Sequence, residues 1–331
     1  MSEYPQIRPR RLRQNGAVRR FARETRLQAG DFILPLFIRE GISEPVPIPT
    51  LPGVFQETVE SVEGAVQRAV DGGISTFILF GIPATKSEDG HEAWAEDGIV
   101  QQGIRRLVAA FGQDIVVMAD CCLDEFTSHG HCGILRDGEV DNDATLPLYG
   151  MVAQSQAAAG ATFIAPSGMM DGQVAAIRAA LDADGACQTG IVSYAAKGAS
   201  VMYGPFRDAA QSTPAFGDRR GYQMPVSNAR EAMREIDLDI AEGADAIIVK
   251  PALTSLDIIY RAHERTLVPT IAYSVSGEHA MLHAGAGAAA FDRRRAVLEV
   301  LSCIRRAGAD RIITYSAVEA AAWLAQEGGE E

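Results

Sequence analysis

Residues 241 to 252 read Ala-Glu-Gly-Ala-Asp-Ala-Ile-Ile-Val-Lys-Pro-Ala, and the fold of the chain follows from this stretch. Gly243 ends a predicted helix, because glycine readily takes the left-handed conformation that closes one. The apolar run 246–249 predicts a buried parallel strand with Lys250 at its end. Burial favours the neutral amine, which can attack a carbonyl. The alternative is an ordinary strand-end lysine whose ammonium group reaches solvent.

A second lysine, Lys197, follows the preceding predicted strand, 191–195, in the same way. Neighbouring parallel strands lie ~4.8 Å apart, so both amines are predicted to open at the same end of a sheet. Two like charges lower the pKa of at least one lysine. This arrangement favours an enzyme that forms a Schiff base with a carbonyl substrate.

Apolar strands alternate with helices along the rest of the chain. The predicted strands are 32–37, 76–80, 115–118, 162–165, 191–195, 246–249, 270–275 and 311–315; the predicted helices are 58–72, 99–111, 148–160, 173–183, 228–242, 256–265, 293–308 and 317–327. Eight such units predict an α/β protein, a (β/α)8 TIM barrel over residues 31–331 that follows an arm over residues 1–30. A doubly wound open sheet is the alternative, but no Gly-x-Gly-x-x-Gly follows the first strand.

In a barrel, side chains alternate between the interior and the outer face of each strand. If Lys250 points inward, Ala246 and Ile248 are predicted to share its face. If Lys197 points inward, the same alternation predicts inward positions for residues 193 and 195, which are serine and alanine.

Composition limits the classes of function. The chain has 331 residues, 47% of them hydrophobic, and a net charge of −13, which argues against a general nucleic-acid surface. We recognise no signal peptide and no apolar run of ~18 residues, so neither export nor a membrane span is expected. Five cysteines, three of them at 121, 122 and 132, indicate reduced cytoplasmic thiols rather than a disulfide framework.

The predicted arm is basic although the protein is acidic. Eight arginines and one acidic residue, Glu24, lie between Arg8 and Arg26. Such a segment can bind nucleic acid or a membrane surface, but only Phe21 supplies an aromatic ring among the arginines. We therefore favour contact with an acidic neighbouring subunit.

A candidate metal site follows the third predicted strand. Asp120, Cys122 and Asp124 share one face if the strand stays extended, and Cys132 returns from the loop. Two thiolates and a carboxylate can hold a divalent ion and leave a position open, as catalytic sites do. A loop of free thiols without metal is the alternative.

Several longer motifs carry a family resemblance. They are Thr-Ser-His-Gly-His-Cys-Gly at 127–133, Tyr-Ala-Ala-Lys at 194–197, Tyr-Gly-Pro-Phe-Arg-Asp-Ala-Ala at 203–210, Phe-Gly-Asp-Arg-Arg at 216–220, Val-Lys-Pro at 249–251, Val-Ser-Gly-Glu at 275–278 and Ile-Thr-Tyr at 313–315. Over residues 8–323 the chain resembles the porphobilinogen synthase family, also called 5-aminolevulinate dehydratase. The resemblance implies a cytoplasmic lyase (hydro-lyase) of tetrapyrrole biosynthesis, assembled into octamers or hexamers. It would condense two 5-aminolevulinate molecules to porphobilinogen with loss of two waters.

The resemblance also implies roles for single residues. Lys250 matches the lysine that holds the first substrate as a Schiff base, and Lys197 matches the second active-site lysine. The implied substrate-binding residues are Ser276 and Tyr315 for the first substrate, Arg207, Arg219 and Gln223 for the second, and also Tyr273 and Asp120. Glu235 matches the position of an allosteric magnesium ligand, and no organic cofactor is implied. The glycine- and proline-rich segment 203–224 is typical of a lid over a substrate.

Three features depart from the family pattern: the metal stretch, position 168 and position 198. Cys122, Asp124 and Cys132 mix the three cysteines of zinc-dependent members with the Ala and Asp of magnesium-type members, so we expect weak or absent zinc. Gly168 replaces a usual aspartate, and Gly198 replaces a bulky aromatic residue, which is expected to leave space beside Lys197.

Two other classes of function remain open from the residues. A class I aldolase or a dihydrodipicolinate-type lyase also uses a barrel lysine but does not require two. A non-catalytic barrel would keep its role after replacement of Lys250.

Overall fold

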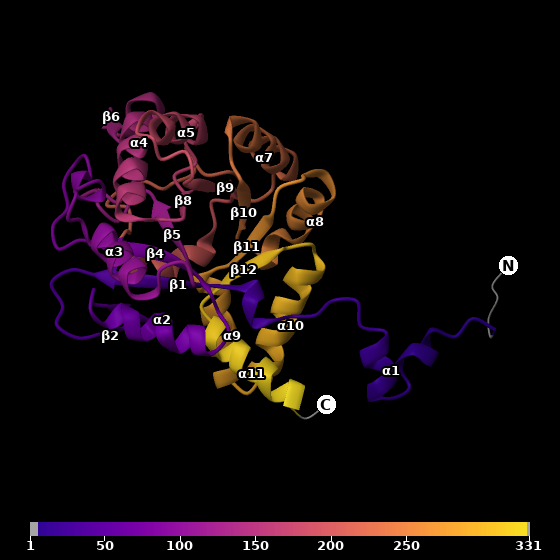
Figure 1. The fold of residues 1–331 in the computed structure, drawn as a ribbon. Helices are drawn as coiled ribbons and strands as arrows, with labels where there is room; N and C mark the ends of the chain where they lie inside the picture. Colours follow the sequence, from indigo (N-terminus) through magenta and orange to yellow (C-terminus); the bar gives the residue numbers. More distant parts are fainter. Residues whose placement is uncertain (1–5, 330–331) are drawn as a thin grey trace.

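Eight parallel strands pair side by side, and the last pairs with the first, in the computed structural model, which describes residues 6–329 (Figure 1). The barrel strands are β1 Phe32–Arg39, β4 Thr76–Ile82, β5 Val116–Cys121, β8 Phe163–Pro166, β9 Gly190–Lys197, β10 Ala246–Lys250, β11 Thr270–Ser274 and β12 Arg311–Thr314. Closure is made where Phe32 and Ile33 pair with Ile312 and Ile313. The predicted TIM barrel is confirmed.

Helices surround the strands (Figure 1). Those that were predicted are α2 Ser61–Asp71, α3 Ile99–Phe111, α4 Asn142–Ala159, α5 Gln173–Ala183, α7 Ala229–Glu242, α8 Leu256–Arg265, α10 Arg293–Arg306 and α11 Ala317–Gly329. Gly160 and Gly243 cap α4 and α7 in the left-handed conformation, with φ of 106° and 112°. This is the ending expected of glycine after a helix.

Some elements differ from the prediction. Helix α4 begins at Asn142 instead of residue 148, because the Asp141 side chain accepts a hydrogen bond from the Ala144 amide and Pro147 lies within the helix. Two further helices, α6 Gly204–Ala210 and α9 Ser276–Gly287, follow β9 and β11. Short strands that were not predicted are β2 Val46–Pro47, β3 Phe55–Glu57, β6 Leu135–Arg136 and β7 Glu139–Val140.

Strand β10 follows the predicted alternation. Ala246 and Ile248 pack in the cluster that fills the barrel interior. Ile247 and Val249 pack in the layer between the strands and the helices. Lys250 therefore continues the inward face of β10.

Strand β9 carries an extra residue opposite β10. Ile247 pairs with Ser193, but Val249 pairs with Ala196, so the register shifts between the two pairs. A β-bulge of this kind resets the alternation and redirects the side chains that follow it. Lys197 consequently reaches the register position directly opposite Lys250.

The bulge changes the faces of the residues before Lys197. Ser193 points to the outer layer, where its hydroxyl donates to Asp239 on α7 at 2.6 Å. Ala195 also packs in the outer layer, whereas Tyr194 packs in the interior cluster. The prediction that Ser193 and Ala195 share the inward face with Lys197 is therefore wrong.

The residues before the barrel extend away from it (Figure 1). They form η1 Pro9–Arg13 and α1 Gly16–Phe21, in which no residue is buried. Ile7, Leu12 and Phe21 are 59%, 53% and 85% exposed. The 3-10 helix η2 Ala29–Asp31 then leads into β1.

Within residues 6–329, none of the helices has both the length and the apolar character needed to cross a membrane.

Candidate active site

Two lysines face each other at the ends of β9 and β10. Lys197 and Lys250 occupy paired register positions, and their side chains are buried. Both Nζ atoms lie over the ring of Tyr194, at 5.6 Å and 5.1 Å from its centroid. The structure thus brings the two predicted lysines together at the carboxyl ends of the strands, where TIM-barrel enzymes carry their catalytic groups.

Aromatic rings enclose the amine of Lys250. Its Nζ lies 4.5 Å from the ring centroid of Tyr273 and 5.0 Å from those of Tyr203 and Phe206. Burial and repulsion by Lys197 together lower the pKa of Lys250 to about 7, against the attraction of nearby carboxylates. With that pKa, about half of the amines are neutral at pH 7. The neutral form is the nucleophile for a carbonyl carbon.

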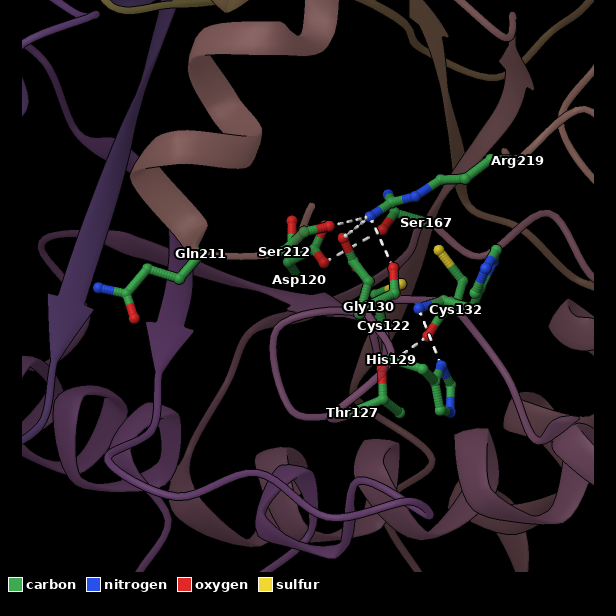
Figure 2. Close-up of polar contacts among 12 residues, drawn as sticks. Asp120, Cys122, Thr127, His129, Gly130, Cys132, Ser167, Gln211, Ser212 and Arg219 are labelled. Atoms are coloured by element: carbon green, nitrogen blue, oxygen red, sulfur yellow. Dashed lines mark hydrogen bonds and ion pairs between the residues drawn. The ribbon is translucent and has the colours of Figure 1, made fainter. Parts of the chain in front are cut away.

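Lys197 is held by the end of the neighbouring strand β8. Its Nζ donates to the carbonyl of Ser167 at 2.5 Å, and the Ser167 hydroxyl donates to Asp120 Oδ2 at 3.1 Å (Figure 2). Within residues 6–329, Asp120 Oδ1 is buried without a hydrogen-bond partner. Burial raises the pKa of Asp120 to about 6, although Lys197 opposes the shift. A carboxyl group with that pKa can take up and release a proton near neutral pH.

The lysines open into a narrow cavity of about 10 Å³. The other residues that line it are Phe80, Asp120, Asp124, Glu125, Ser167, Tyr203, Phe206, Arg207 and Arg219. This space holds about one water molecule. A substrate therefore enters only if the covering segment moves.

The predicted substrate-binding residues do not all meet in this cavity. Arg207 and Arg219 line it, and the Tyr273 hydroxyl lies 2.9 Å from that of Tyr315. Ser276 does not line it. The Ser276 hydroxyl accepts from the Phe206 amide at 3.0 Å and donates to the Met202 carbonyl at 3.2 Å, so it fixes the start of α6.

Gln223 and Glu235 line a separate, larger groove of about 660 Å³. Gln223 is buried, and neither polar atom of its amide has a hydrogen-bond partner within the described chain. Glu235 lies beside other acids of this groove, and burial together with Asp171 and Glu231 raises its pKa. Neither residue reaches the lysine cavity in this conformation.

Arg219 links three segments above the cavity. Its Nη2 lies 2.8 Å from Asp124 Oδ2, and the two side chains are 5% and 4% exposed. The same nitrogen donates to the carbonyls of Ser212 at 2.7 Å and Gly130 at 3.0 Å (Figure 2). The guanidinium group predicted to bind a substrate carboxylate is thus already paired with a carboxylate of the protein.

The predicted metal ligands come together. One donor atom each from Cys122, Asp124 and Cys132 lies within 4.8 Å of the others, and all three residues are buried. Two sulfurs and one oxygen with an open position fit zinc coordination. However, Asp124 also pairs with Arg219, which lowers the pKa of its carboxyl below the usual range against the opposing effect of burial. A metal would compete with this guanidinium group for the carboxylate.

The two unusual glycines have packing reasons. A Cβ on Gly168 would lie 1.8 Å from the hydroxyl of Tyr149, which donates to the Cys132 carbonyl at 2.9 Å. Tyr149 therefore occupies the volume that a side chain at position 168 would need. A Cβ on Gly198 would lie 3.0 Å from the side chain of Val226. The prediction of open space beside Lys197 is therefore wrong.

Several residues of the cavity wall carry no predicted role. Tyr203 and Phe206 belong to a motif noted above but were assigned no role, and Ser167 follows a predicted strand end. Glu125 is buried beside Asp124, and burial raises its pKa well above the usual range. The general rule that strand ends carry the active site would have pointed to Ser167.

A closed parallel barrel with two facing, buried lysines at the carboxyl ends of its strands places the chain in the class of TIM-barrel proteins. The sequence matches the family model of delta-aminolevulinic acid dehydratase over residues 6–323. The chain belongs to this family.

Individual relatives agree with the family match. The delta-aminolevulinic acid dehydratase of Mycobacterium tuberculosis (strain H37Rv) is 51% identical over 98% of this chain and 99% of the relative. That of Archaeoglobus fulgidus is also 51% identical, over 97% of this chain and 99% of the relative. The crystal structure of the Toxoplasma gondii enzyme in complex with the reaction product porphobilinogen superposes with a TM-score of 0.95 at 41% identity, covering 98% of this chain and 94% of that one.

Proposed function

We propose that this protein condenses two molecules of 5-aminolevulinate to porphobilinogen with loss of two waters, as a hydro-lyase of tetrapyrrole biosynthesis. The observation that carries the proposal is the facing pair Lys197 and Lys250 in one buried cavity. Family membership and the product complex of the Toxoplasma gondii relative support it.

In the proposed reaction, the neutral amine of Lys250 attacks the ketone carbon of the first substrate. The carbinolamine then loses water to give an imine, and the protonated imine accepts electron density during the condensation. Lys197 holds or activates the second substrate. Asp120, which bonds to the Ser167 hydroxyl, is suited to move protons between the two amines and the substrates.

Each substrate ends in a carboxylate, and the surrounding groups suit that charge. Arg207 and Arg219 would bind one carboxylate by charge-assisted hydrogen bonds. The hydroxyls of Ser276, Tyr273 and Tyr315 would bind the other. Because Arg219 and Ser276 now bond to protein groups, these contacts form only after the lid segment 203–224 has opened and closed again.

For metals, we propose weak or absent zinc at Cys122, Asp124 and Cys132, where an ion would polarise a bound oxygen as a Lewis acid. The ion pair of Asp124 with Arg219 supports weak binding. We propose that magnesium acts elsewhere, through Glu235 in its acidic groove, since carboxylate oxygens suit this ion.

We propose a cytoplasmic homo-oligomer, an octamer or hexamer, in which residues 1–30 contact a neighbouring subunit. The exposed apolar side chains of Ile7, Leu12 and Phe21 on a segment that leaves its own barrel support this arrangement. The acidic net charge suits a basic arm that docks on another copy.

Incubation of the purified protein with 5-aminolevulinate alone, followed by a colour assay for the pyrrole, tests the proposed function. A class I aldolase would require a different carbonyl partner, and a non-catalytic barrel would form no product. Lys250→Ala should abolish turnover, and borohydride with substrate should label the peptide that contains Lys250. Labelling of another lysine together with full activity of Lys250→Ala would overturn the assignment.

A further inference from the structure

Lysine is rare in this chain. Of its 30 lysines and arginines, only Lys86, Lys197 and Lys250 are lysines. Two of these form the facing pair of the cavity. Lys86 lies in the loop after β4. Nearly all other basic residues of the chain are arginines, but position 86 is a lysine. Lys86 is therefore a candidate for a role that an arginine could not fill.

Lys86 reaches the end of the helix that covers the cavity. Its Nζ donates to the carbonyl of Gln211 at 2.5 Å. Gln211 caps α6 in the left-handed conformation, with φ of 52°. Lys86 is half-buried, and Glu125 and Asp124 lie close enough to raise its pKa, although burial lowers it more. The amine therefore holds the end of α6 and lies within electrostatic reach of the acidic loop after β5.

A second side chain holds the same end of α6. Gln56 is buried, and its Nε2 donates to the Ala209 carbonyl at 2.6 Å. Arg39 donates to the Gln56 amide oxygen at 2.9 Å and so orients the amide. The last carbonyls of a helix have no partner within the helix, and donors from outside satisfy them. Strand β3 and the loop after β4 supply those donors to α6.

We propose that Lys86 and Gln56 form a latch that holds α6 closed over the lysine pair and positions its cavity-lining residues. Phe206 and Arg207 on α6 line the cavity, and the Phe206 ring lies 5.0 Å from Lys250 Nζ. Lys86 and Gln56 do not line the cavity and act through α6, so both are positioning residues. The inference deepens the proposed function and rests on it for its kinetic effect.

The geometry explains why an amine, and not a guanidinium group, suits position 86. An ammonium group is compact and can direct one hydrogen to a carbonyl while its charge faces nearby acids. The guanidinium group is wider, planar and sends its donors out in a fixed fork. Lys86→Arg keeps the charge but should not reproduce the bond to Gln211.

The test compares Lys86→Met and Lys86→Arg with the wild type, and uses Arg106→Lys as a matched control. Arg106 pairs with Glu63 on the outer surface, so its exchange should change nothing. Gln56→Leu removes the second donor independently. Two readouts are measured: the pyrrole assay for kcat and KM, and trypsin cleavage after the exposed Arg220 of the lid without substrate.

In the latched protein, cleavage after Arg220 should be slow. Lys86→Met and Gln56→Leu should both speed it. Lys86→Met should raise KM by about 10- to 100-fold, the range expected for a lost hydrogen bond from a charged group, and Gln56→Leu by about 2- to 10-fold, because its amide is neutral. Lys86→Arg should not restore either value. Thermal unfolding separates lid opening from loss of fold. If the latch exists, the variants should be cleaved faster while their melting temperatures stay close to that of the wild type.

Wild-type cleavage rates and KM in both Lys86→Met and Gln56→Leu would overturn the latch, and so would full rescue by Lys86→Arg. If the wild type makes no pyrrole, the proposed function fails, but the proteolysis comparison still decides whether the latch exists. If Lys86→Met does not fold, Gln56→Leu carries the same test.

Discussion

At the scale of the residue, the reactivity of Lys250 comes from its surroundings. Tyr273, Tyr203 and Phe206 exclude water from the amine, and Lys197 adds a like charge. Both effects disfavour the ammonium form and lower its pKa to about 7. A group with a lowered pKa becomes neutral above that value, so imine formation should rise with pH through this range.

We predict that borohydride trapping of 5-aminolevulinate on Lys250 increases with pH with a midpoint near the pKa of about 7. In Lys197→Gln the midpoint should move to higher pH, because removal of a positive neighbour stabilises the ammonium form. Mass spectrometry of the labelled peptide across the pH range measures the midpoint. An unchanged or lower midpoint in the variant would show that Lys197 does not influence the amine.

At the scale of the element, Arg219 ties the lid to the loop after β5. Arg219→Leu should lower the free energy of unfolding by ~3–5 kcal/mol, because Asp124 would stay buried without its partner. It should also raise KM, since the lid loses its bonds to Ser212 and Gly130. Chemical denaturation and the pyrrole assay measure the two effects.

The neighbouring Arg220 provides a control for this prediction. Its side chain is 80% exposed and pairs only loosely with Asp218 at 3.5 Å, so Arg220→Leu should leave both quantities nearly unchanged. The double variant Asp124→Asn with Arg219→Leu should recover part of the stability lost in Arg219→Leu. Equal losses of unfolding free energy in Arg219→Leu and Arg220→Leu would contradict a special role for the ion pair between Arg219 and Asp124.

The loop that carries Cys122, Asp124 and Cys132 should bind zinc weakly, because one hard oxygen replaces a thiolate and Arg219 competes for it. Asp124→Cys should raise the affinity for zinc. Metal analysis of protein purified without chelator, and activity with and without EDTA, check both statements. One tightly held zinc per chain in the wild type, with activity lost on its removal, would show that the aspartate has no such effect.

At the scale of the whole molecule, the described part of the chain, residues 6–329, buries no residue of η1 or α1 in the arm. Phe21→Glu together with Leu12→Glu should reduce the mass of the assembly, because both exposed side chains would lose an apolar contact on a neighbour. Light scattering coupled to size exclusion measures the mass, and circular dichroism checks that the barrel remains folded. An unchanged mass would mean that the arm does not hold the subunits together.

The sequence alone determined the barrel, its strand order along the chain and the position of Lys250 at the inner end of a strand. These features depend on local patterns. Apolar runs and helix-capping glycines such as Gly243 act over a few residues, and the alternation on β10 needed nothing beyond the strand itself. The longer sequence motifs also indicated the family and the residues expected at its active site.

Only the tertiary structure decided how the side chains meet. The bulge in β9 arises from its pairing with β10 and turned Ser193 outward. Arg219 forms its ion pair with Asp124, and Tyr149 occupies the space beside Gly168. Lys86 donates a hydrogen bond to the end of α6. Each depends on packing between segments far apart in the chain, and such contacts leave no periodic trace in the residues that make them.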